Sequence, residues 1–298
     1  MMIKQKYIKL FRVKSGKKIH LKDYDTSWAQ NEEFKAFGKE QLKERANEIL
    51  EQNLVDLKQV QQLLYADDRY SLLIVFQAMD AAGKDGTIKH VMSGVNPQGC
   101  QVFSFKKPSA EDLDHNFLWR YMKSLPERGR IGIFNRSYYE DVLVVKVHPE
   151  LLQNLPDGKR GKAFWENRYE DINAFERHLE RNGTVILKFF LHLSKDEQKK
   201  RFLERLERPE KNWKFSPSDL PERGHWDDYM EAYEDLINAT STDWAPWYIV
   251  PADNKWVMRA IVADVITSTL RDLDLKFPEL NEEQLKLLEQ ARKTLEEE

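Results

Sequence analysis

The stretch F-Q-A-M-D-A-A-G-K-D-G-T, residues 76–87, closely approaches a phosphate-binding loop without matching it. The Walker A pattern reads G-x-x-x-x-G-K-[ST], and Gly83 and Lys84 occupy its glycine–lysine pair. Ala78 replaces the leading glycine, and Asp85 replaces the hydroxyl residue that normally binds Mg²⁺. The stretch is therefore either a decayed nucleotide site or a loop rebuilt for another phosphate chemistry.

The sequence around this loop has the order that a phosphate-binding loop requires. An apolar run at 71–77 precedes it and a helical pattern at 87–94 follows it. Backbone N–H groups at such a helix start attract anions, and small side chains let phosphate oxygens approach. The residues expected to bind phosphate in this way are Ala81, Ala82, Gly83, Gly86 and Thr87.

Two carboxylates flank the lysine of the loop. Lys84 supplies a point charge for phosphate, whereas Asp80 and Asp85 would repel it unless a metal ion neutralised them. Carboxylate oxygens are the ligands that Mg²⁺ prefers, so we expect both aspartates to bind Mg²⁺ or Mn²⁺. The alternative is an ordinary strand, turn and helix in which the aspartates only cap the helix.

Five apolar runs of strand length lie along the chain. They are continuously apolar and not alternating, which favours buried parallel strands. The runs are 71–77, 100–105, 130–134, 184–191 and 247–251. Helical patterns lie before, between and after them, at 39–65, 87–94, 111–124, 162–181, 195–207, 226–239, 255–272 and 282–296. This alternation predicts an α/β fold: an open parallel sheet of about five strands with helices on both faces, and a ligand site at the strands' carboxyl ends.

The chain shows neither an internal repeat nor a Gly/Ser-rich or Pro-rich linker. We therefore expect one main folded unit, 39–275, in which a helical lid covers about 194–225. Residues 1–38 form an N-terminal arm in this interpretation, and residues 276–298 form a C-terminal helix.

Composition limits the partners and the compartment. Lys and Arg total 47 against 50 Asp and Glu, a net charge of −3, so no general basic field favours nucleic acid. A single cysteine, Cys100, fits a reducing cytosol, and no apolar run approaches the ~18 residues of a membrane span. The basic N-terminus lacks the apolar stretch of a signal peptide. We expect a soluble cytoplasmic protein that binds neither nucleic acid nor membrane.

A second polar segment follows the strand at 130–134. In the stretch I-G-I-F-N-R-S-Y-Y-E-D-V-L, 131–143, Asn135 stands where a Walker B motif places a metal-binding aspartate. Arg136 beside it is a candidate for bidentate contacts to phosphate. The local alternative is that Arg136 only pairs with Glu140 or Asp141 at a helix start.

Cationic residues gather in the expected lid. Arg201, Arg205 and Arg208 share one helix face, from which they could reach over a bound phosphate. The alternative is a solvated surface, since Glu197 and Glu204 lie four residues before Arg201 and Arg208. Further candidates for anion binding are Lys106, Lys107, Arg120, Lys211 and Lys214.

Several segments together resemble the family-2 polyphosphate kinases over roughly residues 40–275. They are A-M-D-A-A-G-K-D-G-T-I-K-H-V-M-S-G-V-N-P-Q-G, F-N-R-S-Y-Y-E-D-V-L-V, the stretch from Lys188 to Leu220, and D-W-A-P-W-Y-I-V-P-A-D-N-K-W. The resemblance implies a P-loop kinase-like fold, Mg²⁺ dependence, and phosphoryl transfer between inorganic polyphosphate and a nucleotide. It also implies catalytic roles for Asp80, Lys84, Asp85, Arg136, Arg201 and Arg205.

The second segment resembles the class III branch of that family. Many members have Asp at the position of Asn135 and Asn at that of Glu140. The branch accepts nucleoside mono- and diphosphates, which implies that AMP, ADP and ATP are substrates and that Asn135, Glu140 and Asp141 bind the nucleotide. In-line transfer of this kind needs no covalent enzyme intermediate. We also expect the chain to form a homo-oligomer.

Two other functions also fit the sequence. One is an ATP-dependent nucleotide kinase of the same fold, and the other is a non-catalytic P-loop protein that binds RNA or another polyanion. RNA binding would favour aromatic side chains on an exposed sheet, whereas Phe189 and Phe190 fall in a buried run. A GTPase is disfavoured because the chain has no [NT]-K-x-D motif.

Overall fold

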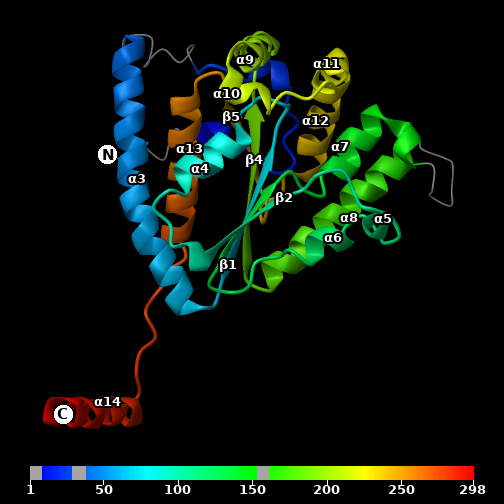
Figure 1. Ribbon diagram of the computed structural model, residues 1–298. Coiled ribbons are helices and arrows are strands. Elements are labelled where there is room, and N and C mark those ends of the chain that lie inside the picture. Colours follow the sequence, from blue (N-terminus) through cyan, green and yellow to red (C-terminus); the bar gives the residue numbers. More distant parts are fainter. Residues whose placement is uncertain (1–8, 29–37, 153–160) are drawn as a thin grey trace.

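The computed structural model describes residues 9–28, 38–152 and 161–298, and its centre is a five-stranded, all-parallel sheet. The strand order is β2-β3-β1-β4-β5, which places the strand before the phosphate-binding loop in the middle (Figure 1). The strands are β1 (Ser71–Gln77), β2 (Cys100–Ser104), β3 (Ile131–Asn135), β4 (Thr184–His192) and β5 (Trp247–Pro251). The predicted sheet is confirmed, with boundaries within one residue of those expected.

The central strand β1 is buried on both faces. Leu72, Ile74 and Phe76 belong to one hydrophobic core, whereas Leu73 and Val75 belong to a second core on the opposite face. Successive side chains of a strand point to opposite faces, so both sets must be apolar. This is the physical reason why the run reads as continuously apolar and not alternating.

Helices cover both faces of the sheet, as predicted. The first core takes its helical residues from α3 (Lys39–Asp67), α4 (Lys84–Val91) and α13 (Lys255–Arg271). The second core takes them from α6 (Trp119–Met122), α7 (Glu140–Val147), α8 (Lys162–Arg181) and α12 (Trp226–Thr240). Figure 1 shows the two groups on opposite sides of the strands. Every connection between strands is a crossover, so the carboxyl ends of all five meet at one edge.

The prediction of a single helix at 111–124 is wrong. The structure has two short helices instead, α5 (Ala110–Leu113) and α6, separated by a turn. The Asn116 side chain accepts a hydrogen bond from the backbone N–H of Leu118 at 3.0 Å. Such a local bond offers the backbone an alternative to the helical ladder, and it interrupts the helix there.

Among the described residues, three α-helices lie outside the expected set. The helix α7 contains the run Val-Leu-Val-Val, whose β-branched residues are typical of strands, but Glu140 and Asp141 in its first turn favour a helix. In the expected lid, α9 (Lys195–Glu207) is followed by the short helices α10 (Pro209–Asn212) and α11 (Asp219–Gly224). Short 3₁₀ turns complete the elements at Leu21–Asp23, Pro97–Gly99 and Pro149–Leu152.

The described part of the N-terminal arm lies along the β5 edge of the sheet. The Val13 N–H donates to the Trp247 carbonyl at 2.8 Å, and Arg12 forms an antiparallel bridge with Tyr248. Farther along, the Thr26 hydroxyl donates to Asp253 at 2.7 Å. This contact covers an edge that would otherwise expose unpaired backbone groups. Residues 1–8 and 29–37 of the arm lie outside the described residues.

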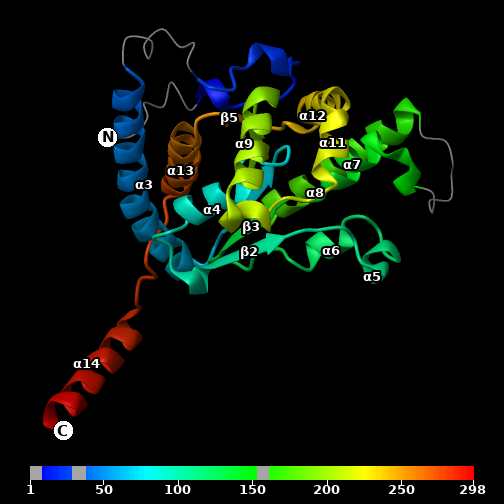
Figure 2. The ribbon, with the colours of Figure 1, turned by 45° about the horizontal axis from the view of Figure 1, so that its top comes forward.

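The C-terminal helix α14 (Glu282–Glu297) stands away from the rest of the molecule (Figures 1 and 2). Leu285, Leu288 and Leu295 are all more than half exposed. Among the described residues, no helix combines the length and the apolar character that crossing a membrane requires.

Candidate active site

The phosphate-binding loop has a conformation that its small residues permit. Ala81 has φ 62° and Gly83 has φ 107°, and Gly83 caps the N-terminus of α4. Any other residue at position 83 would be strained, because its φ is positive. Its Cβ would also lie 3.3 Å from the Met258 Cε, which is a tight contact. The Thr87 hydroxyl donates to the Gly83 carbonyl at 3.0 Å and closes the first helical turn. The loop is therefore held in a defined shape, as an anion cradle must be.

Lys84 lies buried at the centre of this loop. Its Nζ donates to the Ala78 carbonyl at 2.8 Å. Burial lowers the pKa of Lys84, and the nearby Arg136 lowers it further, whereas Asp80, Glu140 and Asp85 act in the opposite direction. The ammonium is thus fixed among charges of both signs, at the place where a phosphate would approach the helix start.

The end of β3 contacts the loop directly. Asn135 donates from Nδ2 to Asp85 Oδ1 at 2.7 Å, and Arg136 donates from Nη2 to Asp80 Oδ1 at 3.0 Å. Arg136 therefore pairs with an aspartate of the loop. Its backbone is left-handed, with φ 66°, a conformation that costs energy for a residue with a side chain.

Glu140 and Asp141 begin α7 behind these residues. Desolvation raises the pKa of Glu140, and the neighbouring Arg136 and Lys84 partly offset this effect. Desolvation likewise raises the pKa of Asp141 to about 6, despite the opposing charge of Arg120. The Tyr121 hydroxyl donates to Asp141 Oδ2 at 3.1 Å. Burial therefore makes both carboxyl groups harder to ionise than carboxyl groups in water, and the pKa of Asp141 lies at about 6.

Arg201 holds the loop from the lid side. Its guanidinium donates to the carbonyls of Ala81 and Ala82 at 3.1 and 2.8 Å, and to those of Ala252 and Asp253 at 2.7 and 3.0 Å. The side chain is only 5% exposed, and it also forms the expected local pair with Glu197 at 2.9 Å. In this structure Arg201 fixes backbone, so it sets the position of the loop.

The other lid arginines lie in different surroundings. Arg205 donates to Asp219 at 3.4 Å and lines the cleft. Arg208 is half exposed and pairs with Glu204 at 3.2 Å and with Glu210 at 2.7 Å. The local pairing of Glu204 with Arg208, given above as the alternative for this helix, is confirmed.

A cleft of about 870 Å³ opens over the loop. Most residues predicted to bind phosphate or metal line it: Asp80, Ala81, Ala82, Gly83, Lys84, Asp85, Gly86, Lys106, Asn135, Arg136, Arg201, Arg205, Lys211 and Lys214. Nine Lys or Arg side chains and four Asp or Glu side chains line the cleft, although the whole chain carries a net charge of −3. The positive charge is thus concentrated at one place, which favours a polyanionic ligand there.

Several predicted residues lie outside the lining of this cleft. They are Thr87, Lys107, Arg120, Arg208, Glu140 and Asp141. Arg120 donates to the Lys106 carbonyl at 2.9 Å and so supports the backbone next to a cleft residue.

The structure also adds residues that the sequence interpretation missed. Lys255 and Arg259 come from the first turns of α13, and the Arg259 Nη2 lies 3.7 Å from a Cβ built on Gly86. Their spacing of four residues, just after the fifth strand, is the signal that could have identified them. The remaining additions to the cleft are Ser104, Phe105, Glu204, Trp213, Ser216, Asp219 and Met258.

The donor set of the loop fits a magnesium ion that is shared with substrate. Asp80 and Asp85 each use one carboxylate oxygen, for Arg136 and Asn135 respectively. Their Oδ2 atoms make no hydrogen bond within the described part of the chain. That part also contains no group of three or more His, Cys, Asp or Glu side chains arranged to hold a metal. Two carboxylates completed by phosphate oxygens and water are typical of Mg²⁺ sites.

Comparison with known proteins gives a consistent result. The sequence model of the family described as Polyphosphate kinase 2 (PPK2) matches residues 40–278. The chain is 54% identical to an ADP-polyphosphate phosphotransferase of Rhodopseudomonas palustris, covering 96% of this chain and 98% of that protein. It is 44% identical to an AMP/ADP-polyphosphate phosphotransferase of Meiothermus ruber, covering 91% and 96%.

A solved structure agrees with these sequence relatives. The crystal structure of Polyphosphate Kinase 2 from Arthrobacter aurescens TC1 superposes with a TM-score of 0.82 at 39% identity. The match covers 91% of each chain.

Proposed function

The chain belongs to the polyphosphate kinase 2 family, and we propose that it catalyses magnesium-dependent phosphoryl transfer between inorganic polyphosphate and both AMP and ADP. Its relatives are named as phosphotransferases between polyphosphate and these nucleotides, so the chain is an enzyme of the polyphosphate-dependent nucleotide kinase class. The magnesium ion, the range of acceptors and the direct mechanism are the finer parts of the proposal.

The observation that carries the proposal is the cationic cleft built over the modified loop. A polyphosphate chain bears about one negative charge per phosphate, so it needs successive cations along its path. Lys211 and Lys214 of the lid and Lys255 and Arg259 of α13 line the same cleft as Lys84. This arrangement suits an extended polyanion whose terminal phosphate reaches the start of α4.

The residues around Lys84 suit the transfer step itself. Phosphoryl transfer requires mainly alignment of donor and acceptor and stabilisation of charge on the transferred group. The loop N–H groups, the Lys84 ammonium and the Arg136 guanidinium would bind oxygens of that group as charge shifts from the leaving to the attacking oxygen. Arg201 would act indirectly, by holding the loop carbonyls in place.

The magnesium ion would be held by Asp80 and Asp85. When bound, it would shield phosphate charge and orient the phosphate oxygens. In the metal-bound enzyme the two aspartates would then cease to repel the substrate, which resolves the conflict between a phosphate cradle and two carboxylates.

Acceptance of both AMP and ADP is the most specific part of the proposal. It is supported by Asn135 and Glu140 in the second segment and by the similarity to the relative named as an AMP/ADP-polyphosphate phosphotransferase. Burial raises the pKa of Glu140, and the nearby charges of Arg136 and Lys84 partly offset this effect. From behind the cleft lining, Glu140 would help to place the nucleotide beside the transferred phosphate.

A single incubation tests the proposal. Purified protein with Mg²⁺, long-chain polyphosphate and AMP should form ADP first and ATP later, measured by anion-exchange chromatography. Lys84→Ala and Asp85→Asn should each reduce the rate by roughly 100-fold or more, since each removes a charge at the transferred group. Lys162→Ala is the matched control, because Lys162 is an exposed lysine of α8 outside the cleft lining, and it should change the rate less than about twofold.

The other outcomes separate the alternatives. Product formation only with ATP as donor would identify a nucleotide kinase, and polyphosphate binding without turnover would identify a binding protein. Full activity of both loop variants would reject the site. ADP as the only accepted nucleotide would reject the proposed acceptor range but not the family activity.

A further inference from the structure

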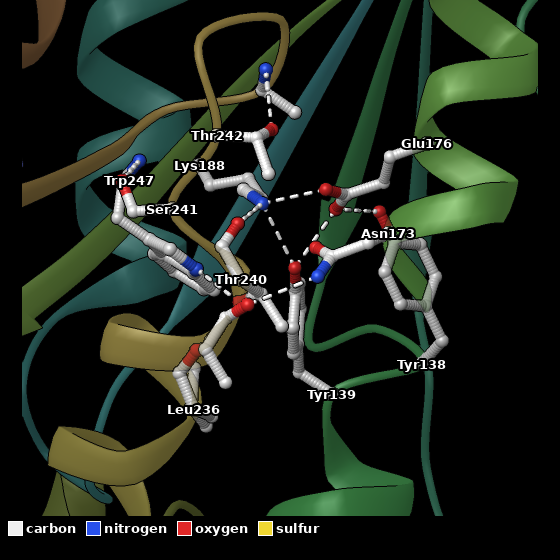
Figure 3. Close-up of polar contacts among 12 residues, drawn as sticks. Tyr138, Tyr139, Asn173, Glu176, Lys188, Leu236, Thr240, Ser241, Thr242 and Trp247 are labelled. Atoms are coloured by element: carbon white, nitrogen blue, oxygen red, sulfur yellow. Dashed lines mark hydrogen bonds and ion pairs between the residues drawn. The ribbon is translucent and has the colours of Figure 1, made fainter. Parts of the chain in front are cut away.

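A fully buried ion pair lies on the side of the second core, behind the segment that ends β3. Lys188 of β4 and Glu176 of α8 are both 0% exposed, and their Nζ and Oε2 atoms are 2.6 Å apart. Figure 3 shows the Lys188 ammonium between Glu176, Tyr139 and Thr240. Lys188 falls within a run of otherwise apolar strand residues, so its charge is unexpected there.

Hydrogen bonds satisfy this pair completely. The Lys188 ammonium donates to Glu176 Oε2 at 2.6 Å, to the Tyr139 hydroxyl at 2.9 Å and to the Thr240 carbonyl at 2.8 Å. An ammonium has three protons, and all three are used. Glu176 Oε1 accepts from the hydroxyls of Tyr138 and Tyr139 at 2.7 and 2.9 Å.

The two tyrosines connect this cluster to the candidate active site. Tyr138 and Tyr139 are both 0% exposed and stand between Arg136 and Glu140 in the chain. Arg136 faces the loop, where it binds Asp80, whereas the tyrosine hydroxyls face the opposite way, toward Glu176. The segment is thus held from two sides.

Such an arrangement costs more to build than an apolar core. Burying two charges requires desolvation that their attraction scarcely offsets, and apolar residues of similar volume commonly serve a core as well or better. The charged cluster fixes the orientation of both tyrosine side chains through hydrogen bonds, whereas apolar contacts would tolerate several orientations. The strained φ of 66° at Arg136 needs such a restraint, since it persists only where the surroundings hold it.

We propose that Lys188, Glu176, Tyr138 and Tyr139 form a positioning cluster that fixes Arg136 and Glu140 for phosphoryl transfer. The expected effect on kcat rests on the proposed function. The expected restraint of residues 136–141 rests on the hydrogen-bond geometry alone. None of the four touches the cleft, so they act through the backbone that they share with Arg136 and Glu140.

The first experiment removes only hydroxyl groups. Tyr138→Phe combined with Tyr139→Phe keeps the rings in the core but frees the segment from Glu176. We expect kcat to fall about tenfold, because small displacements of aligned groups reduce the rate steeply, while KM for polyphosphate changes less than about twofold. Amide hydrogen exchange across 136–141 should become faster in the absence of any ligand.

Tyr169→Phe is the matched control. Tyr169 lies on α8 and is buried in the same core, but its hydroxyl has no hydrogen-bond partner among the described residues. This variant should leave kcat and the exchange of 136–141 unchanged. A fall in kcat equal to that of the double variant would show a general effect of altering the core and would overturn the proposal.

A second variant guards against simple misfolding. Lys188→Met combined with Glu176→Leu replaces the ion pair by apolar groups of similar volume, a change that commonly preserves stability. Its Tm should be lower than that of the parent protein, because the hydroxyls of Tyr138 and Tyr139 and the Thr240 carbonyl lose their partners. The variant should remain folded at the assay temperature and show the same loss in kcat and the same faster exchange. Unchanged exchange and unchanged kcat in this variant would refute the positioning role.

Hydrogen exchange separates this proposal from the proposed function. If the parent protein transferred no phosphate from polyphosphate, the proposed function would fail. Faster exchange of 136–141 in both double variants, with Tyr169→Phe unchanged, would still support the cluster as the anchor of that segment, and unchanged exchange would reject it.

Discussion

Asn135→Asp is the substitution that tests the metal assignment most directly. Asn135 donates from Nδ2 to Asp85 Oδ1 at 2.7 Å, so the amide holds one of the two proposed metal ligands in place. The substitution removes this donor and sets a second carboxylate against the first. Without metal the two charges repel each other, whereas a magnesium ion would bind between them.

The size of the effect follows from that distance. Two unit charges 2.7 Å apart repel by about 1.5 kcal/mol in water and by about 6 kcal/mol at an effective dielectric constant of ~20. Asp85 is exposed and can turn toward solvent, so the lower value applies. The lost hydrogen bond adds about 1 kcal/mol. We expect a destabilisation of about 2.5 kcal/mol at pH 8, which corresponds to a Tm lower by roughly 5 °C.

Thermal unfolding with and without Mg²⁺ measures this effect. Magnesium at ten times its Kd stabilises a folded protein by about 1.4 kcal/mol, and the added carboxylate should lower the Kd in the variant. Mg²⁺ should therefore raise the Tm of the variant more than that of the parent.

Two results would refute the reasoning. The first is a Tm of the variant equal to that of the parent in the absence of metal. The second is an equal rise in the Tm of the variant and of the parent when Mg²⁺ is added. Asn182→Asp is the control, since the Asn182 side chain donates to the His178 carbonyl at 2.7 Å, far from the loop in the sequence, and its substitution should leave the response of the Tm to Mg²⁺ as in the parent.

Three further predictions concern other parts of the site. Arg201→Lys cannot reproduce four bonds to backbone carbonyls, so kcat should fall by at least about tenfold and the Tm should drop; an unchanged kcat would contradict the role given to Arg201. The pKa of Asp141 is about 6 in the folded protein, above its ordinary value of 3.8. The folded state therefore holds that proton more tightly, and stability falls as the pH rises through this window. Asp141→Asn should remove this loss, which amounts to up to about 3 kcal/mol of unfolding free energy. Chemical unfolding at about pH 4 and about pH 7 measures it. If the free energy of unfolding changed equally with pH in the parent and the variant, the assignment to Asp141 would be wrong. Raising KCl from about 50 to about 200 mM should increase KM for long-chain polyphosphate by at least about tenfold, measured by initial rates, because several cations of the cleft bind the chain; a salt-independent KM would argue against binding there.

The sequence by itself determined the sheet and the loop. The continuously apolar run at 71–77 indicated a strand buried on both faces, and the structure confirms this, with Leu72 to Phe76 alternating between the two hydrophobic cores. The glycine–lysine pair that follows it identified the loop, because that geometry depends on residues next to one another in the chain. The prediction of a single helix at 111–124 was wrong, because the hydrogen bond from the Leu118 N–H to the Asn116 side chain interrupts it there. Hydrophobic periodicity does not detect such a local hydrogen bond.

Only the tertiary structure decided which charges act together. Asp85 meets Asn135 across 50 residues, Asp80 meets Arg136 across 56, and Arg201 reaches Ala81 across 120. Local periodicity cannot rank such pairs, because it contains neither the strand order nor the position of α9 over the loop. The same holds for Lys188: in the sequence it is a charge within a strand, and only the packing of α8 against β4 brings Glu176 within 2.6 Å to neutralise it. A charge can be buried only where a distant partner compensates it, and the fold supplies that partner.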